Sequence, residues 1–291
     1  MLRQRKRLRR RALQTQAAAA RAYTSAVTTD LDGCISKAAR ILRQSRYVIS
    51  LIGAGISAES GIPTFRGPDG LWTRLGEPSN NQYQHFLEDP KAWWRQRMSA
   101  QASGSNSHWD NAKPNPAHYA LAELERIGAM RHVITQNIDN LHQVAGTRGI
   151  SEFHGNRFKM RCIGCNRRWD RAELELTAES PPECPDCHGI VKSDTVMFGE
   201  PIPPDAISRS FEEAEKADCC LVIGTSAVVY PAANVPLIVR RNGGRLIEVN
   251  PLETPLSDVC AVVLRGPAGE VMPAVVEALR RQGNETAATA G

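Results

Sequence analysis

The sequence lacks any apolar run of the roughly 18–20 residues that a membrane-spanning helix requires, so we expect no transmembrane segment. It also lacks a low-complexity body, and 42% of its 291 residues are hydrophobic, which is enough to fill a core. A chain of this length is expected to form one large domain, or one domain with a small insert.

Net positive charge is missing from most of the chain. The formal charge is +5, but residues 1–30 hold eight Lys or Arg and one acid, Asp30, which leaves −2 for residues 31–291. A body so close to neutral gives no electrostatic reason to expect a nucleic-acid-binding protein. Contact with nucleic acid is expected only through the basic segment.

Residues 1–30 also lack an apolar h-region, so we do not expect a secretory signal peptide. Their composition favours a disordered basic tail, while an organelle-targeting segment and a polyanion-binding tail stay open as alternatives. We therefore expect a cytoplasmic protein, or a protein of the mitochondrial matrix if residues 1–30 are a targeting segment.

The eight cysteines are not arranged as a disulfide scaffold. Four of them form two Cys-x-x-Cys pairs that are separated by 18 residues, namely Cys162, Cys165, Cys184 and Cys187. This spacing predicts one tetrahedral structural zinc per chain and a reducing compartment. Four thiolates fill the metal's shell, so neither His188 nor a substrate is expected to bind it. A module of about residues 155–195 is too small to fold without the metal.

The complete glycine fingerprint of a dinucleotide site is absent as well. Residues 47–52 form an apolar run typical of a strand buried on both faces, and Gly53-Ala54-Gly55 follows directly. The third glycine is missing, because Ala58-Glu59 stands in its place. Such a turn can present backbone amides to a pyrophosphate, although a plain strand-to-helix turn has the same pattern. The stiff, aromatic and cationic loop at residues 63–66 is unusual for a plain turn.

A pattern of strand, small polar turn and helix is repeated along the chain. Further strands are predicted at residues 132–135, 219–223, 245–249 and 259–264, and helices at residues 32–45, 116–127, 211–216 and 273–281. Asn115 is the expected N-cap of the second helix, with Pro116 at its first position. A short helix at residues 91–98 and a loop at residues 101–113 lie in an insert. The pattern predicts an α/β fold, a Rossmann-like doubly wound parallel sheet with a small zinc-ribbon module and a helical insert. We assign residues 31–154 and 196–282 to the sheet domain.

Polar or small residues follow each predicted strand. Because the carboxyl ends of parallel strands meet at one edge of a sheet, these residues predict one long cleft suited to a dinucleotide. For the cluster at residues 136–140, a solvated turn is the alternative. His154, followed by Gly155, is a candidate catalytic residue, although a lone histidine is more often structural.

The ordered set of motifs resembles the sirtuin family, the NAD-dependent protein-lysine deacylases. The resemblance covers residues 47–282 and includes Gly53-Ala54-Gly55-Ile56-Ser57, residues 60–63 with Phe65-Arg66, residues 135–142, His154-Gly155, both cysteine pairs, Phe198-Gly199-Glu200, Gly224-Thr225-Ser226 and Val229-Tyr230-Pro231.

This resemblance implies a role for each matching residue. Catalysis would fall to His154, as general base, and to Asn137. NAD would be held by Gly53, Ala54, Gly55, Ser57, Glu59, Thr64, Phe65, Arg66, Gln136, Asn137, Ile138, Asp139, Gly224, Thr225, Ser226, Asn250 and Ala268. An acyl-lysine protein substrate would bind as an extended strand against Phe198, Gly199, Glu200, Val228 and Val229.

The implied reaction transfers the acyl group from lysine to ADP-ribose and releases nicotinamide and free lysine. Acetyl is the default acyl group, and longer chains stay open. Removal of dicarboxylic acyl groups is not expected, because residues 93–98 contain no tyrosine for the Tyr-x-x-Arg turn that the resemblance implies for members with that activity. Protein ADP-ribosyl transfer at the same NAD site is the alternative reaction. A non-enzymatic zinc-ribbon protein with a nucleic-acid-binding tail and a dehydrogenase fit the sequence less well.

Overall fold

The structure is a computed structural model, and it describes residues 31–68, 70–103 and 107–289. The predicted disordered tail at residues 1–30 lies outside these residues. Within them, no helix is both long enough and apolar enough to cross a membrane.

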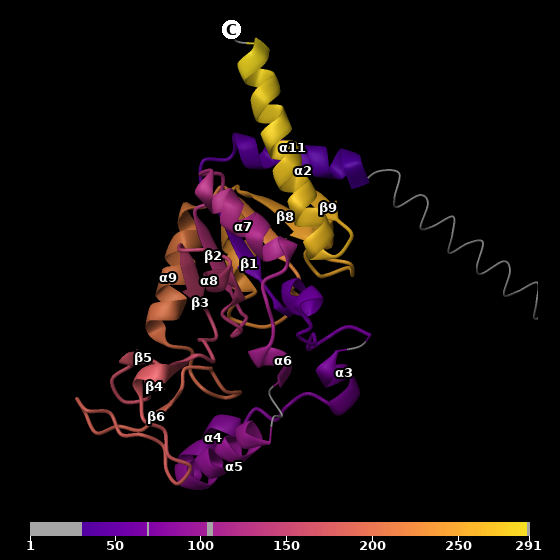
Figure 1. The fold of residues 1–291 in the computed structure, drawn as a ribbon. Coiled ribbons are helices and arrows are strands. Elements are labelled where there is room, and N and C mark those ends of the chain that lie inside the picture. The colour runs from indigo at the N-terminus through magenta and orange to yellow at the C-terminus, as the bar shows by residue number, and fades with distance from the viewer. Residues whose placement is uncertain (1–30, 69, 104–106, 290–291) are drawn as a thin grey trace, which may run out of the picture.

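The described part of the chain is organised around a parallel sheet of six strands (Figure 1). Their order across the sheet is β3-β2-β1-β7-β8-β9. In chain order the strands are β1 (Val48–Ile52), β2 (His132–Thr135), β3 (Ile150–Glu152), β7 (Cys219–Ile223), β8 (Arg245–Val249) and β9 (Val262–Leu264). The order reverses between β1 and β7, which is where a sheet of this kind binds ligands.

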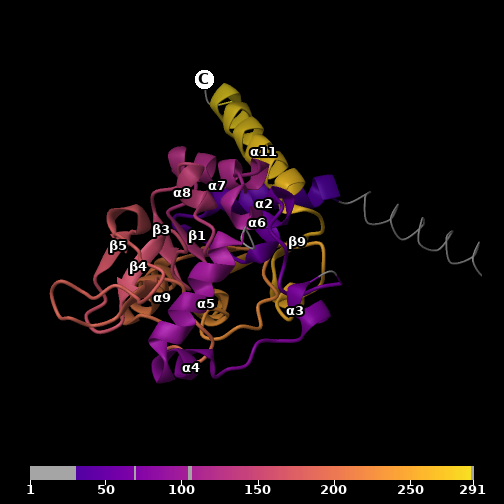
Figure 2. The ribbon, with the colours of Figure 1, turned by 60° about the horizontal axis from the view of Figure 1, so that its bottom comes forward.

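Helices cover both faces of this sheet, as the doubly wound prediction requires. On one face lie α2 (Leu31–Gln44), α7 (Pro116–Arg126) and α11 (Ala268–Thr289), and on the other lie α9 (Pro204–Lys216) and α10 (Asn234–Arg241) (Figures 1 and 2). The strand β1 serves both faces. Val48 and Ile52 belong to the first core and Ile49 and Leu51 to the second, because successive side chains of a strand point to opposite faces.

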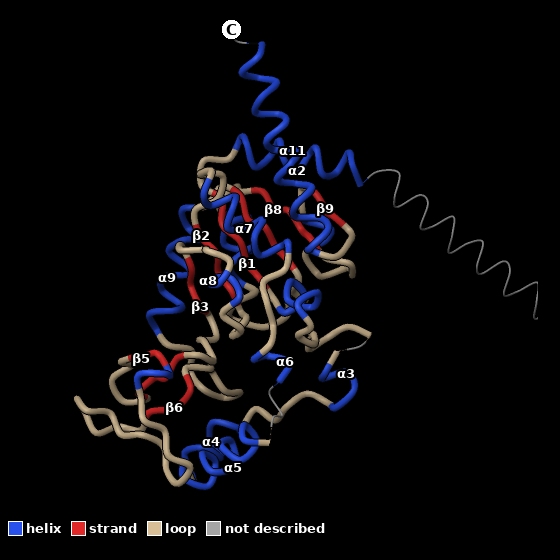
Figure 3. Tube along the Cα trace, in the orientation of Figure 1, coloured by secondary structure: helices blue, strands red, loops and turns tan. Residues whose placement is uncertain are grey.

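A second, antiparallel sheet carries the cysteine pairs. Its order is β5-β4-β6, with β4 (Lys159–Cys162), β5 (Arg168–Asp170) and β6 (Val191–Ser193). We call residues 159–193 the zinc module. The chain also forms a helical segment of α3 (Leu71–Leu75), α4 (Gln82–Glu88), α5 (Pro90–Ala102) and α6 (Ser107–Asp110), of which α4 and α5 lie beside the zinc module (Figure 3). Trp94 of α5 packs into the core of the zinc module and donates a hydrogen bond to the carbonyl of Thr177 at 2.8 Å.

Several predicted boundaries are wrong. The helix expected at 211–216 begins at Pro204, whose missing N–H is harmless in a first turn. The strand expected from Val259 begins at Val262, because residues 257–259 form a 3-10 turn (η3, Ser257–Val259). The last helix begins at Ala268 and continues through Pro273, since its apolar side packs against α2 and α7. Residues 101–113 contain the end of α5 and α6, so they are not all loop.

The start of α7 is as predicted. The Asn115 side chain accepts a hydrogen bond from the backbone N–H of Ala117 at 3.0 Å, and Pro116 occupies the first helical position. Two other short elements connect the strands to the site, a 3-10 helix η1 (Ala54–Ser60) and α8 (Leu141–Val144).

Candidate active site

The strand ends predicted to form one cleft lie side by side. The N–H of Gly53 donates to the carbonyl of Ile223 at 3.0 Å, and the N–H of Gln136 donates to that of Ile52 at 3.0 Å. On the other side, Gly224 donates to Val249 at 3.0 Å. The polar residues after β2, β1, β7 and β8 therefore form one continuous edge across the switch point of the sheet.

The glycines mark the point where two backbones cross. A Cβ on Gly53 would lie 2.7 Å from the carbonyl oxygen of Gly224, and one on Gly55 would lie 2.7 Å from the Cα of Gly224. Gly224 has φ +59, and its own Cβ would meet the nitrogen of Ile56 at 2.4 Å. The turns after β1 and β7 can therefore approach this closely only with glycine at all three positions.

Not all of the amides in this turn are free for a phosphate, which corrects the sequence interpretation. The Gly53 N–H donates to Ile223, and the Gly55 N–H donates to the carbonyl of Gly224 at 2.8 Å. Within the described residues, the Ala54 N–H has no such partner. Of the three amides at residues 53–55, that of Ala54 is thus the one left to face an anion.

Gln136, Thr225 and Asn250 bind one another across three strand ends. The Gln136 amide donates to the Thr225 hydroxyl at 3.1 Å, and the Asn250 amide donates to the Thr225 carbonyl at 2.9 Å. Ser226 is half-buried beside them. Three of the predicted cofactor residues are therefore brought together from β2, β7 and β8.

A buried network joins Ser57, Asn137 and Asp139. The Ser57 hydroxyl donates to Asp139 Oδ2 at 2.7 Å, and Asn137 Nδ2 donates to the Ser57 hydroxyl at 3.2 Å. Burial raises the pKa of Asp139, while hydrogen bonds from Leu141 N–H and the Ser57 hydroxyl oppose this rise. Ser57 is engaged with this carboxylate, and Ile138 lies half-buried between Asn137 and Asp139.

The candidate base His154 is held in one orientation. Its Nδ1 lies 3.1 Å from the carbonyl oxygen of Gln136, and a carbonyl can only accept, so Nδ1 carries the proton. Burial lowers the pKa of His154, which keeps the ring neutral at pH 7 and leaves Nε2 with a free lone pair. The ring contacts Phe153 edge to face, with centroids 5.5 Å apart. A neutral, oriented imidazole suits a general base.

Gly155 ties this histidine to the edge of the zinc module. Its φ is +76, and a Cβ there would lie 1.7 Å from the carbonyl oxygen of Asp194. The N–H of Val196 donates to the carbonyl of His154 at 3.0 Å. The position of His154 thus depends on the segment that follows β6.

The aromatic and cationic loop at residues 63–66 is bound to the first residues of α3 through its backbone. Leu71 N–H donates to Thr64 at 2.8 Å, and Trp72 N–H donates to Phe65 at 2.9 Å. The Phe65 ring packs on Trp72, with centroids 4.8 Å apart, and the Arg66 guanidinium lies over the same indole at 4.6 Å while pairing with Glu77 at 2.8 Å.

Glu59 and Ala268 meet at the start of α11. Glu59 Oε2 accepts the N–H of Gly269 at 2.6 Å, and Ala268 is buried there. A carboxylate at this position is stabilised by the positive end of the helix dipole. The Glu59 side chain therefore caps a helix, which the sequence interpretation did not foresee.

The predicted peptide residues differ in availability. Val228 is exposed, Gly199 is exposed and Phe198 and Val229 are half-buried. Glu200 is 8% exposed, and its carboxylate binds Arg161, Lys192 and the N–H of Met197. Its side chain is thus not available to a peptide, whereas the predicted strand pairing concerns the backbone of residues 198–200 and stays a prediction.

The four cysteines form a metal site. Their Sγ atoms lie within 4.8 Å of one another, and His188 is not among them. Zinc bound by four thiolates at about 2.3 Å places neighbouring sulfurs about 3.8 Å apart. The pairs Cys162–Cys187 and Cys165–Cys184 lie at 3.5 and 3.7 Å, so the donor set and its spacing fit a closed structural zinc.

Trp72 and His118 near the site were not singled out from the sequence, and His142 was included only as the end of the motif at residues 135–142. Trp72 lies in a stretch whose pattern was mixed. His118 and His142 are buried with ring centroids 4.9 Å apart, and His118 Nε2 is 3.5 Å from the Ser57 hydroxyl. Both histidines lie on the buried faces of helices, α7 and α8. Only the tertiary structure brings them together beside Ser57.

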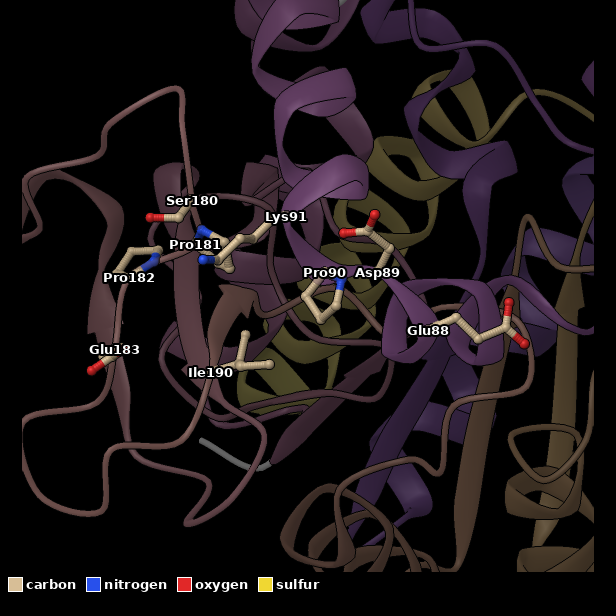
Figure 4. A pocket seen from close by; sticks show the side chains of 9 residues that line it. All are labelled: Glu88, Asp89, Pro90, Lys91, Ser180, Pro181, Pro182, Glu183 and Ile190. Carbon is tan, nitrogen blue, oxygen red and sulfur yellow. The ribbon is translucent and has the colours of Figure 1, made fainter.

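A cavity of about 310 Å³ lies elsewhere, between the helical segment and the zinc module (Figure 4). It is lined by Glu88, Asp89, Pro90 and Lys91 on one side and by Ser180, Pro181, Pro182, Glu183 and Ile190 on the other. None of these residues follows a strand of the parallel sheet, so this cavity is separate from the cleft.

Comparisons with known proteins agree with this geometry. The model of the Sir2 family matches residues 53–231. An NAD-dependent protein deacylase of Pyrococcus abyssi (strain GE5 / Orsay) is 46% identical over 255 residues, which are 85% of this chain and 98% of that protein. A solved Sir2 homolog–NAD complex is 44% identical, with a TM-score of 0.71 over 84% of this chain and 94% of that one. Sir2Af2 bound to a myristoylated histone peptide is 37% identical, with a TM-score of 0.63 over 87% of this chain and 99% of that one.

Proposed function

The chain belongs to the Sir2 family and is an NAD-dependent protein deacylase, and we propose that His154 is the base of its reaction. The observation that carries this role is the hydrogen bond from His154 Nδ1 to the Gln136 carbonyl, because it leaves Nε2 able to accept a proton. The low pKa that burial gives this ring supports the same role at neutral pH.

The residues of the cleft fit a dinucleotide. Gly53, Gly55 and Gly224 let the turns after β1 and β7 cross in close contact at the switch point of the sheet, and the Ala54 N–H there has no backbone partner among the described residues. We assign the pyrophosphate to the turn at residues 53–57, the reacting ribose to Gln136 and Asn137, and the nicotinamide side to Ile138 and Asp139. The adenosine half would lie along Thr225, Ser226, Asn250 and Ala268.

NAD, when bound, supplies the ADP-ribosyl group that receives the acyl group, with release of nicotinamide. The chain's own residues exclude water and move a proton. We propose that Phe65, which packs on Trp72, covers the site, while Asp139 and Asn137 are held in place by Ser57. His154 Nε2 then takes the proton of a ribose hydroxyl after nicotinamide has left.

The substrates are acyl-lysine proteins, and we propose that the peptide binds as an added strand. Within the described residues, the backbone N–H and C=O of Gly199 and of Val228 have no hydrogen-bond partner. Both residues are exposed, so these groups can pair with an extended peptide. The relative Sir2Af2 has been solved with a myristoylated histone peptide, which supports an acylated peptide as the ligand of this cleft.

We further propose that acetyl is the preferred acyl group. The stretch Trp93-Trp94-Arg95-Gln96-Arg97-Met98 has no tyrosine, and the Arg97 guanidinium lies over the Trp93 ring at 5.2 Å. A panel of one peptide carrying acetyl, succinyl and myristoyl lysine, assayed with NAD, tests this. Faster turnover of the succinyl or of the myristoyl peptide would contradict the proposal.

The role of His154 is tested by separating the two halves of the reaction. His154→Ala removes the base but leaves the groups that act before nicotinamide departs. We expect free lysine formation to fall by about 10²- to 10⁴-fold, while exchange of labelled nicotinamide into NAD continues. His188→Ala, which changes an exposed histidine outside the cysteine cluster, is the matched control. Near-normal lysine release by His154→Ala would overturn the assignment.

A further inference from the structure

Four charged side chains are buried where the zinc module meets the predicted peptide site. Arg161 and Lys192 are 4% and 0% exposed at the side chain, and Asp194 and Glu200 are each 2% exposed. Removing charges from water is costly unless each is paired and hydrogen-bonded. These four buried charges therefore contribute little to the stability of the fold. Their hydrogen bonds show which backbone segments they hold in place.

Lys192 uses all of its hydrogen-bonding capacity inside the protein. Its Nζ donates to the carbonyls of Ser193 at 3.0 Å and Thr195 at 2.7 Å, and it pairs with Glu200 Oε2 at 3.0 Å. An ammonium group has three N–H donors, so each has an acceptor. Burial lowers the pKa of Lys192 to about 8 although Glu200 opposes this, so the ammonium is still mostly charged at pH 7.

Glu200 in turn closes the turn at residues 197–200. Its N–H donates to the carbonyl of Met197 at 3.0 Å, and its Oε2 accepts the N–H of Met197 at 2.8 Å. The other oxygen accepts a hydrogen bond from Arg161 Nη2 at 2.5 Å. The carboxylate that binds Lys192 is thus the same group that fixes both ends of the turn.

The tip of this turn packs against the residues around the start of α4 and against Trp72. Gly199 has φ +81, and a Cβ there would lie 2.1 Å from the carbonyl oxygen of Asn80. The Phe198 carbonyl accepts the N–H of Tyr83 at 3.1 Å, and the Phe198 ring packs edge-on against Trp72, with centroids 5.4 Å apart. Because Trp72 also packs on Phe65, Trp72 links the turn to the loop at residues 63–66.

We propose that Lys192 is a positioning residue for the acyl-lysine peptide, because through Glu200 it fixes the turn at residues 197–200 against which the peptide binds. This inference rests on the proposed function of that turn. Lys192 has no exposed surface and does not touch the substrate. Without Lys192, Glu200 keeps the Met197 N–H and Arg161 as partners, and Arg161 also pairs with Asp194. The Glu200 carboxylate and the turn are then held less firmly, while the Rossmann-like cleft keeps its contacts.

The test compares Lys192→Met, which keeps the length of the side chain without its charge, with Lys192→Arg, which keeps a charged donor. For Lys192→Met we expect the KM for an acetyl-lysine peptide to rise at least tenfold and the KM for NAD to change less than twofold, with zinc content unchanged. Lys192→Arg should raise the peptide KM less. Arg167→Met, which removes an exposed ion pair of the zinc module, is the control and should leave both KM values unchanged.

Two measurements without turnover keep the inference separate from the proposed function. Calorimetry gives the affinity for the acetyl-lysine peptide without NAD, and hydrogen exchange follows the N–H groups of Met197 and Glu200. Weaker peptide binding and faster exchange at these two amides in Lys192→Met support the inference, whether or not the wild-type protein turns over the peptide. Absence of wild-type turnover would refute only the proposed function. Unchanged peptide KM and unchanged exchange would overturn the inference. So would an equal rise of both KM values with loss of zinc, which indicates general unfolding of the module.

Discussion

Replacing His142 should change the acid stability of the protein in a defined way. This residue of α8 is 1% exposed, and neither ring nitrogen has a hydrogen-bond partner among the described residues. Burial, with His118 nearby, lowers the pKa of His142 to about 3. A histidine of an unfolded chain titrates near pH 6.5, so the unfolded chain takes up a proton on acidification that the folded protein refuses.

The size of this effect follows from linkage between proton binding and folding. The stability that the folded protein has with His142 neutral is fully present above about pH 6.5 and is lost as the pH falls toward 3. Between pH 7.5 and pH 5.0, His142 lowers the free energy of unfolding by about 2 kcal/mol. His118, whose pKa burial lowers to about 4, has the same sign, whereas Asp139, whose pKa burial raises, has the opposite sign.

Comparison with His142→Leu isolates the one residue, because the other groups titrate in both proteins. Urea unfolding followed by circular dichroism at pH 7.5 and pH 5.0 gives the two free energies. The variant should lose about 2 kcal/mol less than the wild type on acidification. At pH 7.5 it should be at least as stable, since two buried unpartnered nitrogens are removed. His85→Leu, at an exposed position of α4, is the control. Equal pH dependence of His142→Leu and wild type would refute the reasoning.

Two further predictions concern the segments around the candidate base. Gly155→Ala should lower the free energy of unfolding by at least about 3 kcal/mol or prevent folding, because its Cβ would lie 1.7 Å from the Asp194 carbonyl. The control Gly61→Ala, at φ +83 with nothing within 4 Å of the new Cβ, should cost about 1 kcal/mol. Similar melting temperatures for the two variants would argue against this steric account. Cys184→Ala should release the zinc and lower the melting temperature, as metal analysis and thermal unfolding would reveal, and retained metal with unchanged melting would contradict the closed four-sulfur site.

The sequence predicted those features that depend on local patterns. Apolar runs predicted the strands β1, β2, β7 and β8, and the two Cys-x-x-Cys pairs predicted the zinc module. Polar residues after the strands predicted the edge at which Gln136, Thr225 and Asn250 meet. In each case a short stretch determines the structure, so a reading along the chain is sufficient.

Features that depend on distant partners were not predictable in this way. Ser57 and Asp139 are separated by 82 positions, and the start of α11 depends on Glu59, 210 positions before Gly269. Lys192 lies in the short strand β6, and a lysine in a strand usually faces water. Its burial is explained by its ion pair with the buried Glu200. The domain boundaries and the cytoplasmic location stay predictions from the sequence.

The central claim is that this cleft transfers an acyl group from lysine to ADP-ribose. Mass spectrometry of an acetyl-lysine peptide, incubated with the purified protein and NAD, tests it most directly. The account predicts a peptide lighter by one acetyl group, with nicotinamide and acetyl-ADP-ribose formed in equal amounts, and no change when NAD is omitted. A peptide heavier by one ADP-ribosyl group would instead identify a transferase, and an unchanged peptide with intact NAD would contradict both reactions.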